Sequence, residues 1–301
     1  MRYDRKTYYA YARNAPFGGR LSTQQVNGME VILNEWDASG FSDERWLAYA
    51  LATTFWETAQ TMQPIIETRQ PSETTNPSVD TAITRLNKAK AAGKLPWVTK
   101  TPYYWTKDKQ GRSWLGRGFV QLTHYENYLK AGTALGIDLV SNPDRAMDVD
   151  VAVKVLFVGM EQGWFSGDKQ GRHKFSRYFN DTTEDPVGAR RIINGTDKAK
   201  LIADYYKNFL DAIRAAMEAE RKNVRPPEVT TAAATPDDIP ASQSVTGYAL
   251  PTIPAAAGLA VPLIGGVDNL YSLIFSLALL AFAGVLIALF VTGKISIGRT
   301  K

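Results

Sequence analysis

The sequence contains no cysteine and only two histidines, His124 and His173. The absence of cysteine excludes a disulfide framework and any metal site that uses thiolate ligands. Two histidines are too few for a histidine-rich metal centre. We therefore predict neither a metal nor another cofactor.

The first 20 residues contain tyrosines and charged side chains but no apolar stretch, so we predict no secretory signal peptide. Long blocks of Lys and Arg are missing as well. The first 225 residues carry 32 basic and 26 acidic groups. This mild surplus suits an anionic partner such as a bacterial wall, and we predict no nucleic-acid partner.

Helical patterns dominate residues 21–225, which we expect to form one domain together with residues 1–20. Ser42 is expected to open a helix in which Trp46, Ala50, Thr53 and Glu57 lie on one stripe. A short helix is expected near residues 81–92. It lies inside the stretch 70–118, whose Pro, Thr, Gly and Lys content indicates an excursion over the surface.

Further helix boundaries follow from local signals. Thr123 to Glu126 has the pattern of a capping box and predicts a helix that ends at Gly136. Asp148 is expected to cap a helix that runs to about Gln162. The Asp185-Pro186 pair predicts the start of another helix, and residues 197–221 predict a long one.

The composition changes at Pro226. Residues 226–268 are rich in Ala, Pro and Thr, which is typical of a linker. The 22 residues from Leu270 to Val291 are apolar and uncharged, so we predict a transmembrane helix over residues 269–292, with the bilayer as a partner of residues 270–291. Residues 293–301 form a short basic tail.

The charges that flank this span predict its orientation. Lys294, Arg299 and Lys301 follow it and Asp268 precedes it, which places the C-terminus in the cytoplasm and the large domain toward the periplasm and wall. No export signal is visible for that domain. A tail-anchored form with the domain inside the cell is the alternative.

Glu57 is a candidate for acid–base chemistry. It is the only carboxylate between Trp46 and Met62, and it directly follows Phe55 and Trp56. An apolar setting raises the pKa of a carboxyl group, as a general acid near neutral pH requires. A half-exposed glutamate at a helix end is the alternative.

Cleavage of a glycosidic bond also needs a second carboxyl that stays ionised. Glu67 follows Pro64, where the helix has ended and the chain can double back. Glu73 lies in the same loop and is a rival. A solvated loop charge is the alternative for both, and we favour it for Glu73.

Four segments have distinctive sequence motifs and follow one another in a characteristic order. They are ATTFWETAQTMQP at 52–64, GRGFVQLTHYENY at 116–128, GIDLVSNPD at 136–144 and RIING at 191–195. Together, over roughly residues 45–210, they resemble glycoside hydrolase family 19, which includes chitinases and phage or bacterial endolysins. Trp56 departs from this pattern, because many members have histidine there, and the loop between Glu67 and Gly116 is long.

The resemblance implies a mainly α, lysozyme-like domain with two lobes, a cleft and a small loop or β region. It also implies an inverting mechanism with Glu57 as the general acid and Glu67 as the general base. The implied substrate-binding residues are Gln121, Thr123, Asn127 and Asn194, with Tyr104 and Trp105 as possible stacking surfaces and Arg117 as a residue that either orients a carboxylate or braces the fold. Thr123 as a helix cap and Asn194 as a turn former are the structural alternatives.

The resemblance leaves the substrate open between two polymers with the same linkage. We expect peptidoglycan, cut between N-acetylmuramic acid and N-acetylglucosamine. The chain lacks the cysteines typical of plant chitinases, and its sequence motifs look closer to those of wall hydrolases. Chitin is the alternative substrate. A non-catalytic glycan-binding module, or a membrane-anchored protein whose hydrolase core has decayed, is the alternative class.

Overall fold

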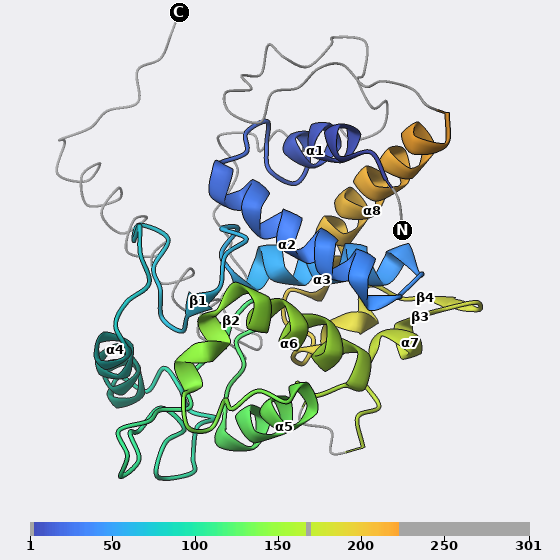
Figure 1. Ribbon diagram of the computed structural model, residues 1–301. Coiled ribbons are helices and arrows are strands. Elements are labelled where there is room, and N and C mark those ends of the chain that lie inside the picture. Colours follow the sequence, from blue (N-terminus) through green and yellow to red (C-terminus); the bar gives the residue numbers. More distant parts are fainter. Residues whose placement is uncertain (1–2, 167–169, 223–301) are drawn as a thin grey trace, which may run out of the picture.

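The computed structural model describes residues 3–166 and 170–222, and these residues form a mainly helical domain with very little sheet (Figure 1). The α-helices are α1 (Arg5–Asn14), α2 (Thr23–Ser39), α3 (Glu44–Glu57), α4 (Val79–Ala91), α5 (Tyr125–Leu135), α6 (Val149–Gln162), α7 (Phe175–Tyr178) and α8 (Ala199–Lys222), with 3-10 turns η1 (Pro143–Met147) and η2 (Gly188–Ile192). The predicted fold class, mainly α with a small β region, is confirmed.

The β structure consists of two short antiparallel pairs. Strand β1 (Ile65–Ile66) pairs with β2 (Arg117–Gly118), so that Ile65 lies opposite Gly118. Strands β3 (Phe179–Asn180) and β4 (Thr183–Glu184) form the second pair. The first pair matters most for function, because it joins the loop after α3 to the segment that precedes α5.

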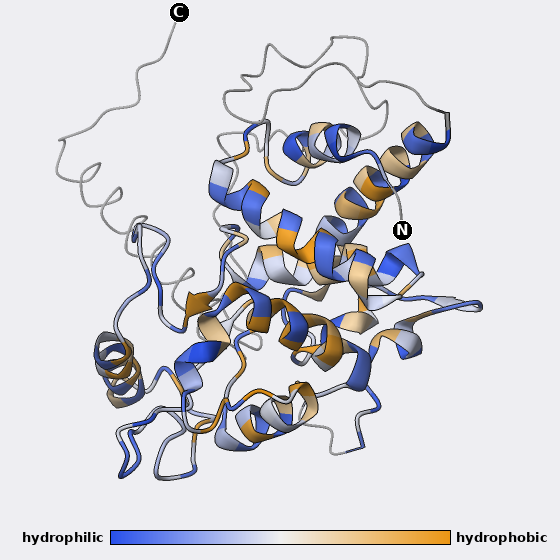
Figure 2. Cartoon of the chain, viewed as in Figure 1, coloured by the Kyte–Doolittle hydropathy of each residue, from blue (hydrophilic) through white to orange (hydrophobic). Residues whose placement is uncertain are grey.

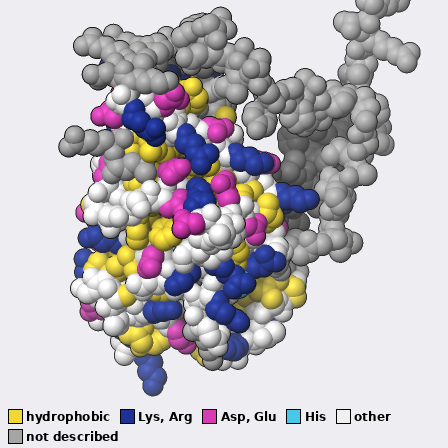
Figure 3. Space-filling view, turned by 90° about the vertical axis from the view of Figure 1, so that its right-hand side faces the viewer, with side chains coloured by type: hydrophobic (Ala, Val, Ile, Leu, Met, Phe, Trp, Pro, Cys, Tyr) yellow, Lys and Arg dark blue, Asp and Glu magenta, His cyan; other side chains and the backbone are white. Residues whose placement is uncertain are grey.

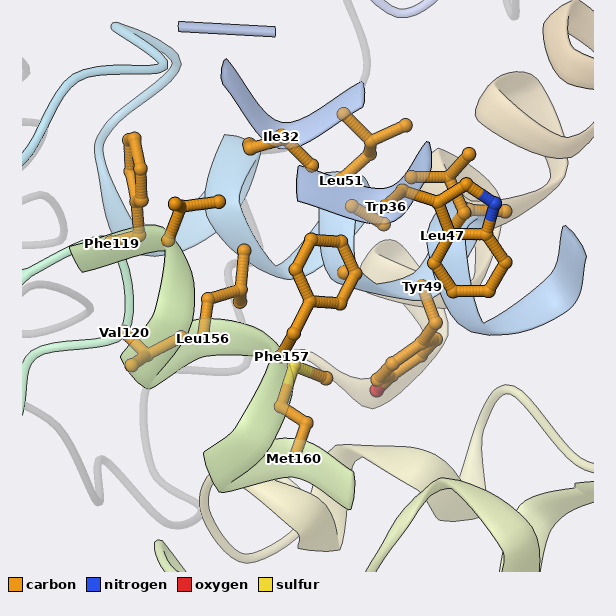
Figure 4. Close-up of a cluster of buried hydrophobic side chains, with 14 of the residues drawn as sticks. Ile32, Trp36, Leu47, Tyr49, Leu51, Phe119, Val120, Leu156, Phe157 and Met160 are labelled. Carbon is orange, nitrogen blue, oxygen red and sulfur yellow. The ribbon is translucent and has the colours of Figure 1, made fainter. Parts of the chain in front are cut away.

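The main core lies between α2, α3 and α6, with α8 and α1 packed on the other side of α3. Figure 4 shows Trp36 of α2, Leu47 of α3 and Phe157 of α6 converging in this core. All three side chains are essentially inaccessible to solvent. Burial of aliphatic and aromatic side chains on this scale is the main stabilising contribution to the fold.

Most of these helices carry both hydrophobic and hydrophilic residues, as expected for helices with one buried side (Figure 2). Helix α3 is the exception, because residues 47–55 are all buried. A helix that is buried on nearly every side holds its last residue, Glu57, in a fixed place.

A glycine on α2 allows the chain after α3 to approach closely. A Cβ atom on Gly28 would lie 1.6 Å from the carbonyl oxygen of Met62. The chain between Glu57 and Glu67 therefore lies directly on α2, and no larger residue than glycine fits there without displacing it.

A second, smaller hydrophobic cluster forms a separate lobe at the lower left of Figure 1. It contains Ala82 and Leu86 of α4 together with Leu95, Trp105 and Leu115 from the loops that follow. We refer to residues 79–115 as the α4 lobe. The predicted short helix at 81–92 is confirmed as α4, and the predicted surface excursion has a core of its own.

Several predicted helix boundaries agree with the structure to within one or two residues. Asp43, not Ser42, caps α3, while Asp148 precedes α6 and residues 199–222 form the long last helix. The predicted capping box at Thr123 is wrong. Helix α5 begins one residue later than this box requires, with His124 at the N-cap position and no side-chain cap bond, and the Thr123 hydroxyl donates to the carbonyl of Gln121 at 2.6 Å.

Within residues 3–166 and 170–222, no helix has the length and apolar character needed to cross a membrane. The linker predicted over residues 226–268, the membrane span over 269–292 and the tail over 293–301 lie outside the described residues. These three assignments, with the orientation derived from them, stay predictions.

Candidate active site

Glu57 is the last residue of α3 and is buried, with 5 % of its surface exposed. Its Oε1 lies 2.6 Å from Nη1 of Arg190, a buried residue of η2. The Arg190 Nε also donates to the carbonyl of Asp197 at 3.0 Å, which fixes the guanidinium. Glu57 is therefore one half of a buried ion pair, not an isolated carboxyl on an apolar helix.

Tyr49 lies close enough to this pair to be influenced by both charges. Burial raises the pKa of Tyr49, while Arg190 lowers it and Glu57 raises it. The Tyr49 hydroxyl and the Arg190 Nη2 are both buried, and neither has a hydrogen-bond partner among the described residues. Two buried hydrogen-bond donors near the ion pair therefore have no partner within the described part of the chain.

Glu67 follows β1 and is also buried, with 7 % of its surface exposed. Its Oε1 accepts a hydrogen bond of 2.7 Å from the hydroxyl of Tyr104, and its Oε2 accepts one of 2.8 Å from the backbone N–H of Gly116. The Glu67 N–H donates to the Gly116 carbonyl at 2.8 Å. Both carboxylate oxygens are therefore held in place by the α4 lobe and the end of the segment that leads into β2.

Burial raises the pKa of the Glu67 carboxyl above its ordinary value. The hydrogen bonds from Gly116 and Tyr104 and the charge of Arg117 lower the pKa, but burial outweighs them. Glu67 thus has the elevated proton affinity that the sequence pattern suggested for Glu57.

Glu73, the rival to Glu67, has a different environment. It forms an ion pair with Arg85 of α4, with 2.6 Å between Oε1 and Nη2, and it accepts a bond from the Gln70 N–H. The hydrogen bond from Arg85 lowers the pKa of Glu73 to about 2. Its geometry ties the loop to α4, whereas Glu67 is the loop glutamate that is buried at the β1–β2 pair.

Three of the predicted sugar-binding residues stabilise the segment around β2. The Gln121 amide donates to the Ile65 carbonyl at 3.0 Å, and the Asn127 amide donates to the Thr123 carbonyl at 2.7 Å. A Cβ atom on Gly116 would lie 2.7 Å from Oε1 of Gln121. Gln121 is therefore next to the peptide that holds Glu67, and these side chains shape the site.

Arg117 and Trp105 have structural roles. Arg117 is buried, donates to the carbonyls of Ser113 and Leu115, and forms an ion pair with Asp144 at 2.8 Å. It braces the fold, and its charge also acts on the Glu67 carboxyl, whose pKa it lowers.

Trp105 is fully buried in the core of the α4 lobe, stacked on Tyr103, and its Nε1 donates to Asn87 at 2.8 Å. Its ring is therefore not a surface on which a sugar can stack. Tyr104, its neighbour, is only half-buried and points its hydroxyl at Glu67.

Asn194 lies just after η2, where its Oδ1 accepts a bond of 2.8 Å from the N–H of Gly195. This contact is the local turn expected from the Asn-Gly pair. The functional residue of this region that the sequence analysis missed is Arg190. Its neighbour Arg191 is exposed, and no local pattern distinguishes which of the two adjacent arginines points inward.

Among the described residues, no group of three or more His, Cys, Asp or Glu side chains is placed to hold a metal ion. A cavity of about 370 Å³ is lined by Glu44, Arg214, Met217, Glu218 and Arg221. Glu44 and Glu57 are at opposite ends of α3, about 20 Å apart at 1.5 Å per residue, so this cavity is separate from the carboxylates.

Residues 87–172 match the family model of glycoside hydrolase family 19, described as chitinase class I. The match supports a family 19 domain in this chain. It includes Tyr104, Gly116 and the segment through Asn127, but it begins after Glu57 and Glu67 and ends before Arg190. The assignment of Glu57 therefore rests on the resemblance of residues 52–64, that of Glu67 on its place in the loop that follows, and both stay predictions.

Plant chitinases are among the relatives. Chitinase 11 of Oryza sativa subsp. japonica is 34 % identical over 122 residues, which cover 33 % of this chain and 45 % of the relative. Basic endochitinase of Vitis vinifera is 46 % identical over 48 residues, covering 16 % of this chain and 15 % of the relative. Acidic endochitinase Q of Nicotiana tabacum is 47 % identical over 49 residues, covering 16 % and 19 %.

The chain thus spans less than half the length of these curated relatives. Their names support a glycoside hydrolase and favour chitinase, the alternative substrate class of the sequence analysis, over an endolysin. These relatives give no support to the expectation that the sequence motifs are closer to those of phage and bacterial wall hydrolases.

Proposed function

We propose that this chain is a glycoside hydrolase that cleaves β-1,4 bonds in a polymer of N-acetylated amino sugars, with a chitin-like N-acetylglucosamine polymer as its substrate. The observation that carries the proposal is the pair of buried glutamates, each fixed by contacts to distant parts of the chain. Burying carboxylates is costly, and acid–base catalysis is a use that justifies the cost.

In this proposal one carboxyl protonates the glycosidic oxygen as the C1–O bond breaks, and the other takes a proton from the water that forms the new bond to C1. The resemblance assigns the first role to Glu57 and the second to Glu67. This assignment requires Glu67 to act as a base although burial raises its pKa. Tyr104 and the Gly116 N–H hold Glu67 in one orientation toward the water.

Peptidoglycan is the second candidate substrate, because it has the same linkage and carries negative charge. The specific observation in its favour is the positive charge of the α4 lobe, which contacts Glu67 through Tyr104. Chitin, a neutral polymer, makes no use of that charge.

The test compares the full wild-type chain with Glu57→Gln and Glu44→Gln on chitin oligomers and on peptidoglycan sacculi. Glu44→Gln is the matched control, since it makes the same change at the other end of the same helix. Mass spectrometry identifies the products, and NMR of the fresh product identifies its anomer. We expect an α-anomeric product from the wild type and the control only. A wild-type chain that binds these glycans and cleaves neither would contradict the proposal and indicate a binding module.

A further inference from the structure

The positive charge of the globular part is concentrated in the α4 lobe. Residues 79–115 contain eight basic and two acidic side chains. The remaining residues of 1–225 contain 24 basic and 24 acidic side chains. The entire surplus of this region therefore belongs to 37 residues that form one lobe with its own core.

Five of these eight basic side chains, Lys90 and four exposed lysines, form no ion pair with an acidic side chain among the described residues. Arg85, Lys107 and Arg112 form ion pairs, whereas Lys88, Lys94, Lys100 and Lys109 are exposed and form none. Trp97 lies between Lys94 and Lys100 in sequence and is also exposed, with 43 % of its surface accessible. Exposed ammonium groups and an exposed aromatic ring within one lobe of 37 residues suit a polymer that offers both negative charge and sugar faces.

Other parts of the surface differ. On the upper part of the face shown in Figure 3, acidic and basic side chains lie next to one another, whereas its lower part carries mainly basic side chains. Charges of both signs at this spacing largely cancel beyond a Debye length of about 8 Å at physiological salt. The α4 lobe lacks this compensation, so its field reaches farther into solvent.

The lobe is joined directly to the candidate base. Tyr104, which belongs to the lobe, donates to Glu67, and Arg85 of α4 donates to the Thr68 carbonyl at 3.0 Å. These two contacts fix the lobe to the loop that carries Glu67. Attraction at this position raises the local concentration of a charged polymer at the site.

We propose that the α4 lobe is a docking surface for a glycan strand that carries carboxylate groups, such as peptidoglycan with its stem peptides. The proposal rests on the proposed function for the bond that is cleaved, and it concerns the second candidate substrate named there, peptidoglycan, which carries the carboxylates that neutral chitin lacks. The lobe's lysines attract the carboxylates, and Trp97 contacts a sugar face.

The experiment measures sedimentation of the full chain with three insoluble polymers at about 25 mM and about 300 mM NaCl: sacculi, sacculi whose carboxylates have been converted to neutral methylamides, and fully N-acetylated chitin. The test variant replaces Lys88, Lys94, Lys100 and Lys109 with Gln. The control variant replaces Lys6, Lys154, Lys200 and Lys207, which are exposed on other helices, so the net charge changes equally.

We expect the test variant to bind sacculi roughly tenfold or more weakly than wild type at low salt, and the control to bind as wild type does. Salt and carboxylate neutralisation should weaken wild-type binding in the same way, and chitin binding should not distinguish the variants. Equal effects of both variants, or unchanged binding by the test variant, would overturn the proposal. Equal loss of binding to anionic lipid vesicles and to sacculi would assign the lobe to anionic surfaces in general and overturn it as a glycan site.

Sedimentation requires no bond cleavage. A wild-type chain that binds sacculi through the lobe but cleaves no glycan would refute the proposed function and leave the docking surface standing. Cleavage without lobe-dependent binding would do the reverse.

Discussion

The end of α3 and the loop after β1 each hold a buried glutamate, and they do so by different means. Glu57 is held by a charged partner, Arg190, whose guanidinium is fixed by a second contact. Glu67 is held by two neutral donors, a tyrosine hydroxyl and a backbone N–H. The first region supplies a full opposite charge, whereas the second supplies dipoles in an apolar setting.

This difference shows how one fold can keep two carboxyl groups chemically distinct. Catalysis by a carboxyl pair requires groups whose environments separate their proton affinities. Burial raises the pKa of Glu67, and the surrounding donors only moderate the increase. The resemblance to family 19 assigns the proton to Glu57, so the comparison between the two regions can be tested directly.

The largest expected effect comes from removing either carboxyl. Glu57→Gln and Glu67→Gln should each lower kcat by about 10²–10⁴-fold on a natural glycan, because each removes one half of acid–base catalysis. An aryl glycoside with an acidic phenol as its leaving group needs no general acid, so it should restore cleavage in the acid variant. Added azide, which replaces the activated water, should restore cleavage in the base variant.

Recovery of Glu57→Gln on the aryl glycoside and of Glu67→Gln with azide would support the assignment from the resemblance. The opposite pattern would exchange the two roles and agree with the raised pKa of Glu67. Either result supports catalysis by the two carboxyl groups, whereas unchanged activity in both variants would exclude it.

Arg190→Met should have the next largest effect. It leaves the Glu57 carboxylate buried without a partner, which costs about 3 kcal/mol of unfolding free energy. Urea denaturation measures the loss, and Arg191→Met is the matched control because Arg191 is adjacent and exposed. The double variant Arg190→Met with Glu57→Gln should recover part of the loss. If Arg191→Met is equally destabilised, the buried ion pair is not the source.

Tyr104→Phe should have a moderate effect confined to the Glu67 region. Loss of the hydroxyl removes a donor that lowers the pKa of Glu67, so this pKa rises further. If Glu67 is the base, the acid limb of the pH–rate profile moves to higher pH and kcat at neutral pH falls about tenfold. Tyr103→Phe serves as the control, since Tyr103 packs on Trp105 and does not contact Glu67 through a hydrogen bond.

The smallest effect should be on the pH dependence of stability. Because burial raises the pKa of Glu67 in the folded chain, proton binding at this residue favours folding. That contribution is complete at low pH and is lost as pH rises through the folded-state pKa. Glu67→Gln cannot ionise, so its Tm should rise relative to wild type between about pH 4 and pH 8.

Glu73→Gln should show the opposite trend, because Arg85 lowers the pKa of Glu73 to about 2. The stabilisation by Glu73 is present above its unfolded pKa and is lost as pH falls. The Tm of Glu73→Gln should therefore lie below that of wild type at neutral pH, and the difference should become smaller as the pH falls. Parallel pH trends for the two variants would rule out the proposed difference in environment.

Local patterns predicted the elements that depend on neighbours in sequence. The stripe on α3, the short helix of the α4 lobe and the start of α6 all follow from periodicity and capping signals, which act over three or four residues. The capping box predicted at Thr123 does not form, because His124, with a φ of 73°, occupies the N-cap position of α5.

Trp105 shows a different limit. An aromatic residue in a polar loop fits both a stacking surface and a small core, and composition does not distinguish them. Only the arrangement of α4 and the loops around it buries the ring and leaves Tyr104 to contact Glu67.

The sequence by itself determined the helical class, the position of Glu57 at the end of an apolar helix and the concentration of lysines in residues 79–115. The tertiary structure decided which groups surround the two carboxylates. Arg190 is 133 residues from Glu57, and Gly116 is 49 residues from Glu67. Contacts over such separations depend on how whole elements pack, and no local pattern of hydrophobicity or turn residues encodes them.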